Sequence, residues 1–298
     1  MEAVKSVAGK NLAMIAESVY TSAIEAKARG EKIGWIASNF PQEIPATLGI
    51  SCVYPESQAA AISAKGAGLA MCEHAEGELG LSNDICAYSR ISQAYADLAL
   101  CPNEEREMPL PDFVLCCNNI CSCMHKWYEN LGKMLDVPVI MIDIPFNNEY
   151  DVDRKRIEYV SAQFRDAISQ LEEITGKKWD EGRFQKVCRI SSAVGEEWLK
   201  ATKYLNYKSA PYKGFDLFNH MAVATMARGQ QESLDALKAF NDECEQFIKG
   251  HKSTFKGEEK YRIMFEGIAC WPYLKATYSP LAHAGVNVTS CVYGPSFA

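Results

Sequence analysis

The chain of 298 residues carries 31 basic and 38 acidic side chains, for a formal net charge of −7, and 48% of its residues are hydrophobic. This composition is typical of a soluble globular protein long enough for two domains. Nucleic acid is excluded as an expected partner because no block of basic residues occurs. A membrane is excluded because no uncharged apolar run approaches the ~18 residues of a membrane span.

The first part of the chain alternates predicted strands and helices. In chain order these are a strand at 33–38, an Ala-rich helix at 57–72, a helix at 82–100, a strand at 111–119, a helix at 120–135 and a strand at 138–146. Apolar strands joined by helices are typical of a parallel α/β sheet. Residues 1–150 are therefore predicted to form a first α/β domain with an N-terminal helix.

From residue 151 the pattern changes to apolar residues that recur every three or four positions, which predicts helices. A helical segment is predicted at 151–255, with helices that run to near 176 and then at 184–205, 216–228 and 231–249. Strands return at 261–268 and 286–294, with a short helix at 279–285 between them. Two parallel strands cannot cover both faces of a sheet. The stretch 256–298 is therefore expected to be the start of a second, incomplete α/β domain, and the sequence a fragment.

Twelve cysteines occur in a chain whose N-terminal stretch lacks the apolar core of a signal peptide. This usage predicts reduced thiols and a cytoplasmic location, where metal binding is favoured over disulfides. No CxxC pair exists, so a zinc ribbon and a thioredoxin-type site are both disfavoured. Five isolated cysteines are predicted to be structural, namely Cys52, Cys72, Cys101, Cys188 and Cys244.

The stretch CCNNICSC at 116–123 holds the most interesting thiols. Cys121 follows two asparagines at the expected first turn of a helix, and Cys86 lies at another expected helix N-terminus. Both places stabilise a thiolate through the helix dipole and free backbone N–H groups. Both cysteines are candidate metal ligands, and core packing is the alternative. Cys116 and Cys117 are predicted to pack inside a strand, and Cys123 to point away from Cys121.

Two further side chains are candidates for binding substrate. Ser38 ends the first predicted strand, where it could bind a substrate oxygen or act as a turn residue. Glu56 could be a base or a first-turn acid that stabilises a helix. The sequence contains no GxSxG elbow and no P-loop, so neither a hydrolase nucleophile nor a nucleotide loop is indicated.

Eight stretches in chain order carry a resemblance to a known family. They are IGWIASNFPQEIPATLG, YPESQAAAISAKGAG, MCEHAE, NDICAYSRISQAYADL, CCNNICSCMHKWYE, PVIMIDIPFNNEYD, FDLFNHMAVATMARG and MFEGIACWP. Together they resemble the 2-hydroxyacyl-CoA dehydratase family, and most closely the beta subunits of the lactoyl-CoA and 2-hydroxyglutaryl-CoA enzymes. Benzoyl-CoA reductase subunits belong to the same wider family.

The resemblance implies two Rossmann-like parallel-sheet domains joined by a helical segment, with an iron–sulfur cluster between them. It also implies a heterodimer with an alpha-type subunit, a separate ATP-dependent iron–sulfur activator protein and a 2-hydroxyacyl-CoA substrate. By the motifs NDIC and NNIC, Cys86 and Cys121 are implied ligands of a [4Fe–4S] cluster, and the third ligand is expected beyond Ala298. Flavin (FMN) is associated with some relatives, but no motif here indicates it.

The resemblance also implies that Ser38 and Glu56 are catalytic residues. Elimination of water from a 2-hydroxyacyl thioester must remove a β-hydrogen that the carbonyl does not acidify, and one-electron reduction to a ketyl radical overcomes this. An open iron site can act as a Lewis acid, and a nearby carboxylate or hydroxyl can move the proton. Two alternatives remain open: an aryl-CoA reductase subunit of the benzoyl-CoA reductase type, and a non-catalytic iron–sulfur scaffold subunit.

Overall fold

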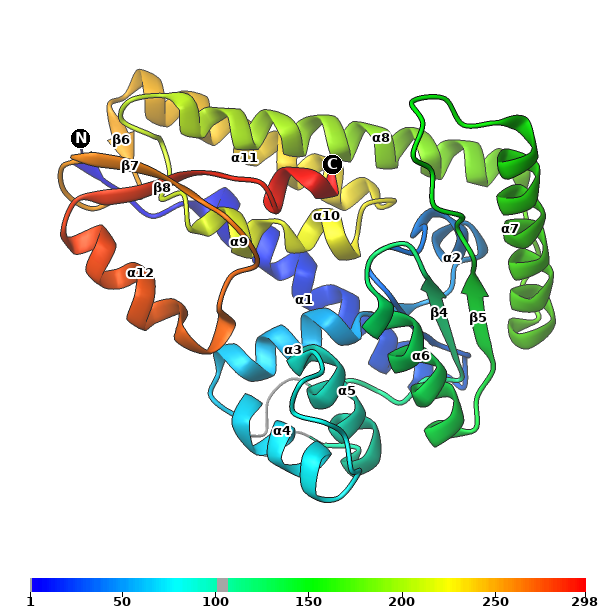
Figure 1. Cartoon of the computed structure of the whole chain (residues 1–298). Helices are drawn as coiled ribbons and strands as arrows, with labels where there is room; N and C mark the ends of the chain where they lie inside the picture. Colours follow the sequence, from blue (N-terminus) through cyan, green and yellow to red (C-terminus); the bar gives the residue numbers. More distant parts are fainter. Residues whose placement is uncertain (1, 101–106) are drawn as a thin grey trace. The chain divides into compact units, whose positions relative to one another are not determined.

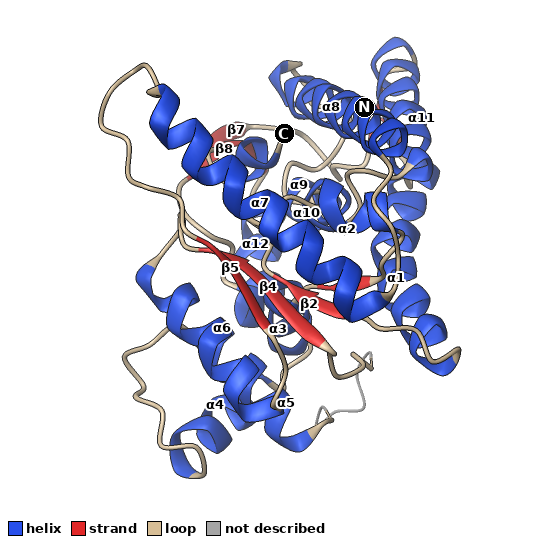
Figure 2. Ribbon diagram, turned by 90° about the vertical axis from the view of Figure 1, so that its right-hand side faces the viewer, coloured by secondary structure: helices blue, strands red, loops and turns tan. Residues whose placement is uncertain are grey.

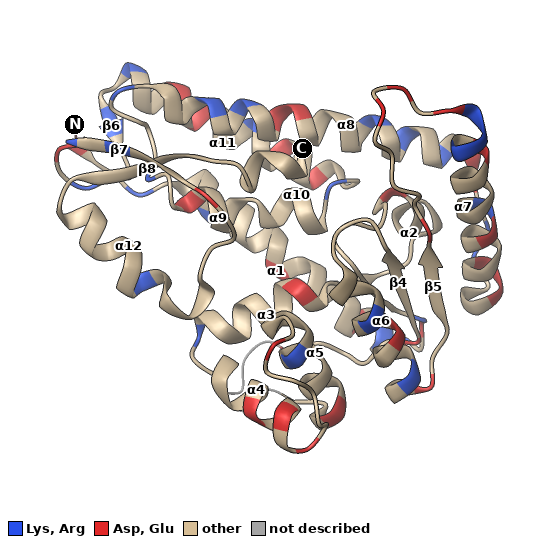
Figure 3. Ribbon diagram, viewed as in Figure 1, with Lys and Arg blue, Asp and Glu red and all other residues tan. Residues whose placement is uncertain are grey.

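The computed structural model describes residues 2–100 and 107–298 of the chain (Figure 1). The chain divides into two compact units, one formed by Val19–Phe184 and the other by Met1–Ser18 together with Gln185–Ala298. Basic and acidic side chains both occur along the long helices α7, α8 and α11, which span Arg154–Thr175, Glu181–Lys203 and Gln231–Lys249 (Figure 3). None of the described helices is both long and apolar enough to span a membrane.

The unit formed by Val19–Phe184 is built on a four-stranded parallel sheet. Its strands are β2 (Gly34–Ile36), β3 (Cys52–Val53), β4 (Phe113–Cys117) and β5 (Val139–Ile142), in the spatial order β3-β2-β4-β5. Every residue of β4 is buried, because a central strand is covered on both faces. The chain order reverses between β2 and β4. In open α/β sheets such a switch point is where ligands bind, beyond the carboxyl ends of the strands.

Helices cover both faces of this sheet. They are α1 (Val7–Ala28, whose last part belongs to this unit), α2 (Glu43–Leu48), α3 (Pro55–Ala64), α4 (Gly68–Gly77), α5 (Ala87–Leu98), α6 (Ser122–Leu135) and α7. Helices α3, α5 and α6 lie on one face and α7 lies on the other (Figure 2). The rings of Phe40 and Phe164 meet edge to face at 6.4 Å, which holds α7 against the loop that follows β2.

Two predicted helices are each broken in the structure. The helix expected at 57–72 ends at Ala64 and restarts at Gly68, because Gly66 adopts a positive φ of 95°, which no α-helix contains. The helix expected at 216–228 is divided into α9 (Asp216–His220) and α10 (Ala222–Met226). The strand expected at 33–38 is shorter than predicted and spans Gly34–Ile36, which leaves Ser38 in the loop that follows it.

Close packing of α6 on β5 depends on a glycine. A Cβ atom at Gly132 would lie 2.1 Å from Val139 Cγ2. We expect Gly132→Ala to lower the free energy of unfolding by about 1–2 kcal/mol in urea titrations, because overpacking outweighs the helix propensity of alanine. Gly77→Ala is the matched control, since Gly77 ends α4 with nothing within 4 Å of its added Cβ. Equal stability of the two variants would contradict this packing.

The other unit combines helices with two short parallel strand pairs. Besides α8, α9, α10 and α11 it contains β1 (Glu2–Ala3), η1 (Tyr204–Asn206), β6 (Lys252–Ser253), β7 (Tyr261–Phe265), η2 (Trp271–Tyr273), α12 (Leu274–His283), β8 (Val286–Cys291) and η3 (Gly294–Phe297). Strand β7 pairs with β8 and β1 pairs with β6, both in parallel. The helix predicted at 279–285 begins earlier, at Leu274, and contains Pro280.

Large aromatic residues form the core of this second unit. Trp198, Tyr212, Phe218 and Phe240 are all buried there. The indole N–H of Trp198 donates to the carbonyl of Gly294 at 2.9 Å, so the one polar atom of this side chain is satisfied. Parallel strands combined with helices in both units confirm the predicted α/β class.

Candidate active site

The structure brings Ser38 and Glu56 together at the carboxyl edge of the four-stranded sheet. Ser38 follows β2, and Glu56 follows β3 in the first turn of α3. The backbone N–H and the hydroxyl of Ser38 donate to Glu56 Oε1, at 3.1 and 3.2 Å respectively. The two residues meet because β2 and β3 are parallel neighbours, so their carboxyl ends lie side by side.

A third group, which the sequence did not predict, completes the contacts of the Glu56 carboxylate. The hydroxyl of Tyr128 donates to Glu56 Oε2 at 3.0 Å. Tyr128 is fully buried on the face of α6 that packs on the sheet. A buried tyrosine usually finds a partner for its hydroxyl. The sequence could have indicated only that a tyrosine on the buried face of this helix needs a hydrogen-bond partner. It could not have indicated that the partner is Glu56.

Burial and hydrogen bonding act in opposite directions on Glu56. Burial raises the pKa of the Glu56 carboxyl above its ordinary value. Hydrogen bonds from its own backbone N–H, from Ser38 and from Tyr128 act to lower the same pKa, because they stabilise the charged form. The site therefore holds a half-buried carboxyl whose ionised form is stabilised by donors from two other elements. Such a group can take up and release a proton during a reaction.

The thiols of β4 lie behind this carboxyl and are inert. Burial and the nearby Glu56 charge raise the pKa of Cys116, and burial raises the pKa of Cys117 to about 12. Both thiols therefore stay protonated, and both are fully buried, as predicted for packing residues. Among the cysteines predicted to be structural, Cys52, Cys72 and Cys244 are buried and Cys188 is partly buried, whereas Cys101 lies outside the described residues.

Asparagines brace the loops at the switch point. Asn39, after β2, donates from Nδ2 to the carbonyl of Cys117 and to Asn119 Oδ1, both at 2.9 Å, so it ties together the loops that follow β2 and β4. Asn39 Oδ1 is buried and has no hydrogen-bond partner among the described residues. Asn118 accepts from the backbone N–H of Ile144 at 2.8 Å, which fixes the loop after β5. Hydrogen bonds therefore join the loops at the edge of the sheet that carries Ser38, and Asn39 Oδ1 is the acceptor that they leave unused.

Cys86 and Cys121 occupy equivalent places on two helices. Cys86 is the N-cap residue of α5 and Cys121 is the N-cap residue of α6, and both are exposed. Helix α5 begins at Ala87, later than the helix predicted at 82–100, and α6 begins at Ser122, close to the predicted start at 120. Each cysteine thus precedes the first turn of its helix, at the positive end of the helix dipole. Cys123, the second residue of α6, is partly buried.

The two N-cap cysteines lie at the same end of neighbouring helices. The indole N–H of Trp127 on α6 donates to Ser92 Oγ on α5 at 3.1 Å, and each of these residues lies equally far along its helix from its cysteine. Tyr95, further along α5, donates to the carbonyl of Met108 at 3.0 Å, just ahead of β4, so α5 runs from the carboxyl edge toward the amino edge of the sheet. Helix α6 runs the same way, since it joins two parallel strands.

This arrangement provides two accessible thiolate donors, the ligand type that iron–sulfur clusters use. In the described part of the chain, no group of three His, Cys, Asp or Glu residues is placed to hold a metal ion. The described residues can therefore supply part of a ligand set, and the complete set is not present among them. The role of Cys86 and Cys121 as ligands therefore stays a prediction.

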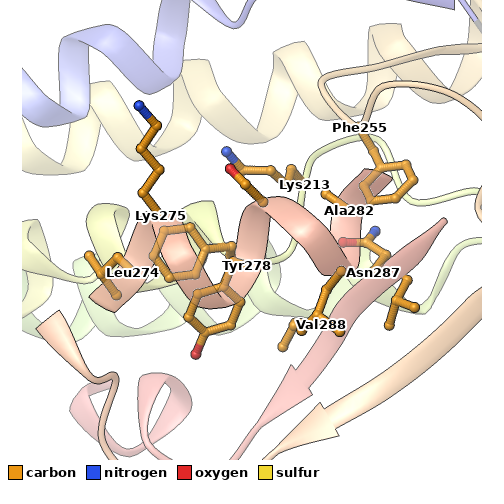
Figure 4. A pocket seen from close by; sticks show the side chains of 12 residues that line it. Lys213, Phe255, Leu274, Lys275, Tyr278, Ala282, Asn287 and Val288 are labelled. Carbon is orange, nitrogen blue, oxygen red and sulfur yellow. The ribbon is translucent and has the colours of Figure 1, made fainter. Parts of the chain in front are cut away.

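A cavity of about 280 Å³ lies in the other unit, between α12, β8 and the chain that precedes α9 (Figure 4). Its lining includes Lys213, Lys275, Tyr278 and Asn287. Lys213 pairs with Asp216 at 3.0 Å, and Asn287 Oδ1 accepts from the backbone N–H of Gly214 at 2.9 Å. These contacts show structural roles for two of the polar lining residues. None of the predicted site residues lines this cavity.

Comparison with known proteins agrees with the resemblance seen in the sequence. A family model described as 2-hydroxyglutaryl-CoA dehydratase, D-component, matches residues 37–296. The chain is 58% identical to the (R)-phenyllactyl-CoA dehydratase alpha subunit of Clostridium sporogenes, over 92% of this chain and 67% of that protein. It is 46% identical to the (R)-2-hydroxyisocaproyl-CoA dehydratase alpha subunit of Clostridioides difficile, over 94% of this chain and 68% of that protein.

The third relative is the (R)-2-hydroxyglutaryl-CoA dehydratase subunit alpha of Acidaminococcus fermentans, at 39% identity over 95% of this chain and 74% of that protein. All three relatives are named alpha subunits, whereas the motifs in the sequence resembled beta subunits most closely. The chain belongs to the 2-hydroxyacyl-CoA dehydratase family, a family of hydro-lyases.

Proposed function

We propose that this chain is the alpha-type subunit of an (R)-2-hydroxyacyl-CoA dehydratase, which eliminates water from a 2-hydroxyacyl-CoA to give a 2-enoyl-CoA. The observation that carries the proposal is the Glu56 carboxyl, which is bound by Ser38 and Tyr128 at the carboxyl edge of the sheet, beside the switch point. The names of the three relatives support the same reaction class.

Glu56 serves as the base in this proposal. One electron added to the thioester carbonyl gives a ketyl radical anion, which expels the neighbouring hydroxyl and leaves an enoxy radical with an acidic β C–H. The Glu56 carboxylate takes up that β-proton, and the electron is then given back, so no net oxidation or reduction occurs. The proton and the hydroxide together make up the water that is lost. General-base assistance of this kind contributes roughly 10²–10⁴ in rate.

Ser38 binds the reacting part of the substrate. Its hydroxyl donates to Glu56 while that residue is ionised, so the lone pairs of Oγ remain to accept from the hydroxyl of the substrate. Once Glu56 is protonated, the Ser38 hydroxyl is released to donate to the thioester oxygen.

Cys86 and Cys121 would hold a [4Fe–4S] cluster, which when bound supplies one-electron chemistry and a Lewis-acidic iron. Their exposed positions at the N-termini of α5 and α6 leave both thiols accessible to a cluster. The partners in this proposal are a beta-type subunit, which replaces the alpha-type partner expected from the sequence, and an ATP-dependent iron–sulfur activator protein.

The proposal is tested by the balance of electrons. The chain, purified anaerobically with its partner subunit and activator, is supplied with (R)-phenyllactyl-CoA and (R)-2-hydroxyisocaproyl-CoA, the substrates in the names of two relatives. We expect many molecules of 2-enoyl-CoA per electron supplied. Consumption of reductant in proportion to product would instead support an aryl-CoA reductase. Unchanged turnover after loss of the Glu56 carboxylate would favour a scaffold role for this chain.

A further inference from the structure

The two oxygens of Glu56 have unequal surroundings. Oε1 accepts two hydrogen bonds, from the backbone N–H and the hydroxyl of Ser38, and Oε2 accepts one, from the hydroxyl of Tyr128. A carboxylate oxygen can accept about two hydrogen bonds. The backbone N–H of Glu56 is a further donor to the same carboxyl, and the Tyr128 hydroxyl is the donor that α6 contributes.

We propose that Tyr128 is a positioning residue that orients the Glu56 carboxyl through its hydrogen bond to Oε2 and keeps it ionised, ready to take up the substrate proton. This inference rests on the proposed role of Glu56 as the base. Tyr128 acts through Glu56 alone and need not touch the substrate. It lies on α6, the helix that Cys121 begins, so the same helix that carries a proposed cluster ligand also orients the base.

Tyr128 is suited to act as a constant donor. Burial and the nearby Glu56 charge raise the pKa of Tyr128 well above its ordinary value, so its hydroxyl keeps its proton. A donor that cannot ionise favours the charged form of its acceptor, and the Tyr128 hydrogen bond accordingly lowers the pKa of Glu56 against the effect of burial.

Two other titratable residues act on the groups of this site, Cys116 and Tyr54. Cys116 faces Glu56 from β4, and the Glu56 charge together with burial raises the pKa of its thiol. Tyr54, the residue before α3, acts on Tyr128 in the same direction as Glu56 does. The strongest influences that lower the pKa of Glu56 among the described residues are hydrogen bonds, from the backbone N–H groups of Glu56 and Ser38 and from the hydroxyls of Tyr128 and Ser38.

Tyr128→Phe tests the inference, because it keeps the buried ring and removes only the donor. In the complex with the partner subunit, we expect the acid limb of the profile of kcat against pH to move to higher pH. At the acid end kcat should fall by about tenfold, the effect of one hydrogen bond to a charged group, and it should recover at the alkaline end. The KM for the acyl-CoA should change little, since Tyr128 is not proposed to bind it.

Tyr95→Phe is the matched control. Tyr95 is also a buried tyrosine of the same unit, and its hydroxyl is bonded to the backbone of Met108 at 2.8 and 3.0 Å. Its removal should cost stability as Tyr128→Phe does and should leave the pH profile where it is. Equal profiles for wild type and Tyr128→Phe would overturn the inference, as would an equal shift in both tyrosine variants.

A spectroscopic measurement separates this inference from the proposed function. The infrared C=O band of the protonated Glu56 carboxyl, identified by its loss in Glu56→Gln, gives the pH at which this residue titrates. We expect the midpoint to lie at higher pH in Tyr128→Phe than in wild type. An unchanged midpoint would overturn the role of Tyr128, whereas full turnover of Glu56→Gln would overturn the role of Glu56 instead.

Discussion

Glu56→Gln is expected to lower kcat about a thousandfold, within the range that loss of a general base produces. The amide cannot take up the β-proton, yet it has nearly the shape of the carboxyl. Its oxygen can still accept from Ser38, and its NH2 group can donate to the oxygen of Tyr128, which is able to accept as well as donate. The variant should therefore fold and bind the acyl-CoA, and the loss should appear in kcat.

The measurement is initial-rate kinetics of the complex with its partner and activator. Glu129→Gln is the matched control, because Glu129 is an exposed carboxylate on α6 that pairs with Lys126 at 2.7 Å and with His125 at 2.9 Å. Such a surface pair contributes little, so this variant should keep wild-type kcat and stability. A Glu56→Gln variant that turns over at the wild-type rate with its iron intact would remove Glu56 from the mechanism.

The same variant should be more stable than wild type at neutral pH. Because burial raises the pKa of Glu56 in the folded state, the folded chain disfavours the charged form more than the unfolded chain does. At acid pH Glu56 is neutral in both the folded and the unfolded state, so it does not lower the free energy of unfolding. As the pH rises through the unfolded pKa and then the folded pKa, the wild type loses stability that glutamine, which never ionises, retains. Thermal unfolding at several pH values measures the difference, which should vanish on acidification.

A gain in stability that accompanies a loss of activity would mean that the carboxyl is kept for its chemistry. A variant that is less stable at every pH would instead assign Glu56 a structural role, with its three hydrogen bonds as the reason.

Local patterns in the sequence were sufficient for the elements that position the site. The stretch FVLCC is apolar throughout because β4 lies between two strands and under helices on both faces, so its burial could be predicted. The asparagines before Cys121 marked the end of a strand and the start of a helix, and Cys121 is indeed the N-cap of α6. Hydrophobic periodicity and helix caps depend on residues that are close together in the chain, so both can be predicted from the sequence.

Contacts between distant elements could not be read in the same way. The bond between Tyr128 and Glu56 joins α6 to α3, and it depends on the strand order β3-β2-β4-β5, which no local pattern specifies. The break at Gly66 was missed for a different reason. The alanines around it favour a helix, and a single glycine in a helix costs only about 1 kcal/mol, whereas the turn that Gly66 makes at positive φ is set by how α4 packs on α5.

Removal of either N-cap thiol should cost the protein one cluster. Cys86 and Cys121 lie at the same end of two packed helices, and each is exposed beside free backbone N–H groups. Both residues would supply ligands to a cluster, since thiol sulfurs are the ligands that iron–sulfur clusters use. Alanine in place of either residue removes a ligand that no other described residue can replace, because no further His, Cys, Asp or Glu completes a metal-binding group with the remaining one.

Iron and acid-labile sulfide, measured after anaerobic purification with the partner subunit, should therefore fall by roughly four atoms each in Cys86→Ala and in Cys121→Ala, the content of one [4Fe–4S] cluster. Cys123→Ala is the matched control on α6, where removal of a partly buried thiol two residues further along should leave the iron content unchanged. Both ligand variants should keep the wild-type unfolding temperature measured in the absence of iron, since exposed thiols contribute little to packing. Full iron content in Cys121→Ala would show that Cys121 is not a ligand of the cluster. Loss of iron in Cys123→Ala would show that Cys123 is needed to hold it.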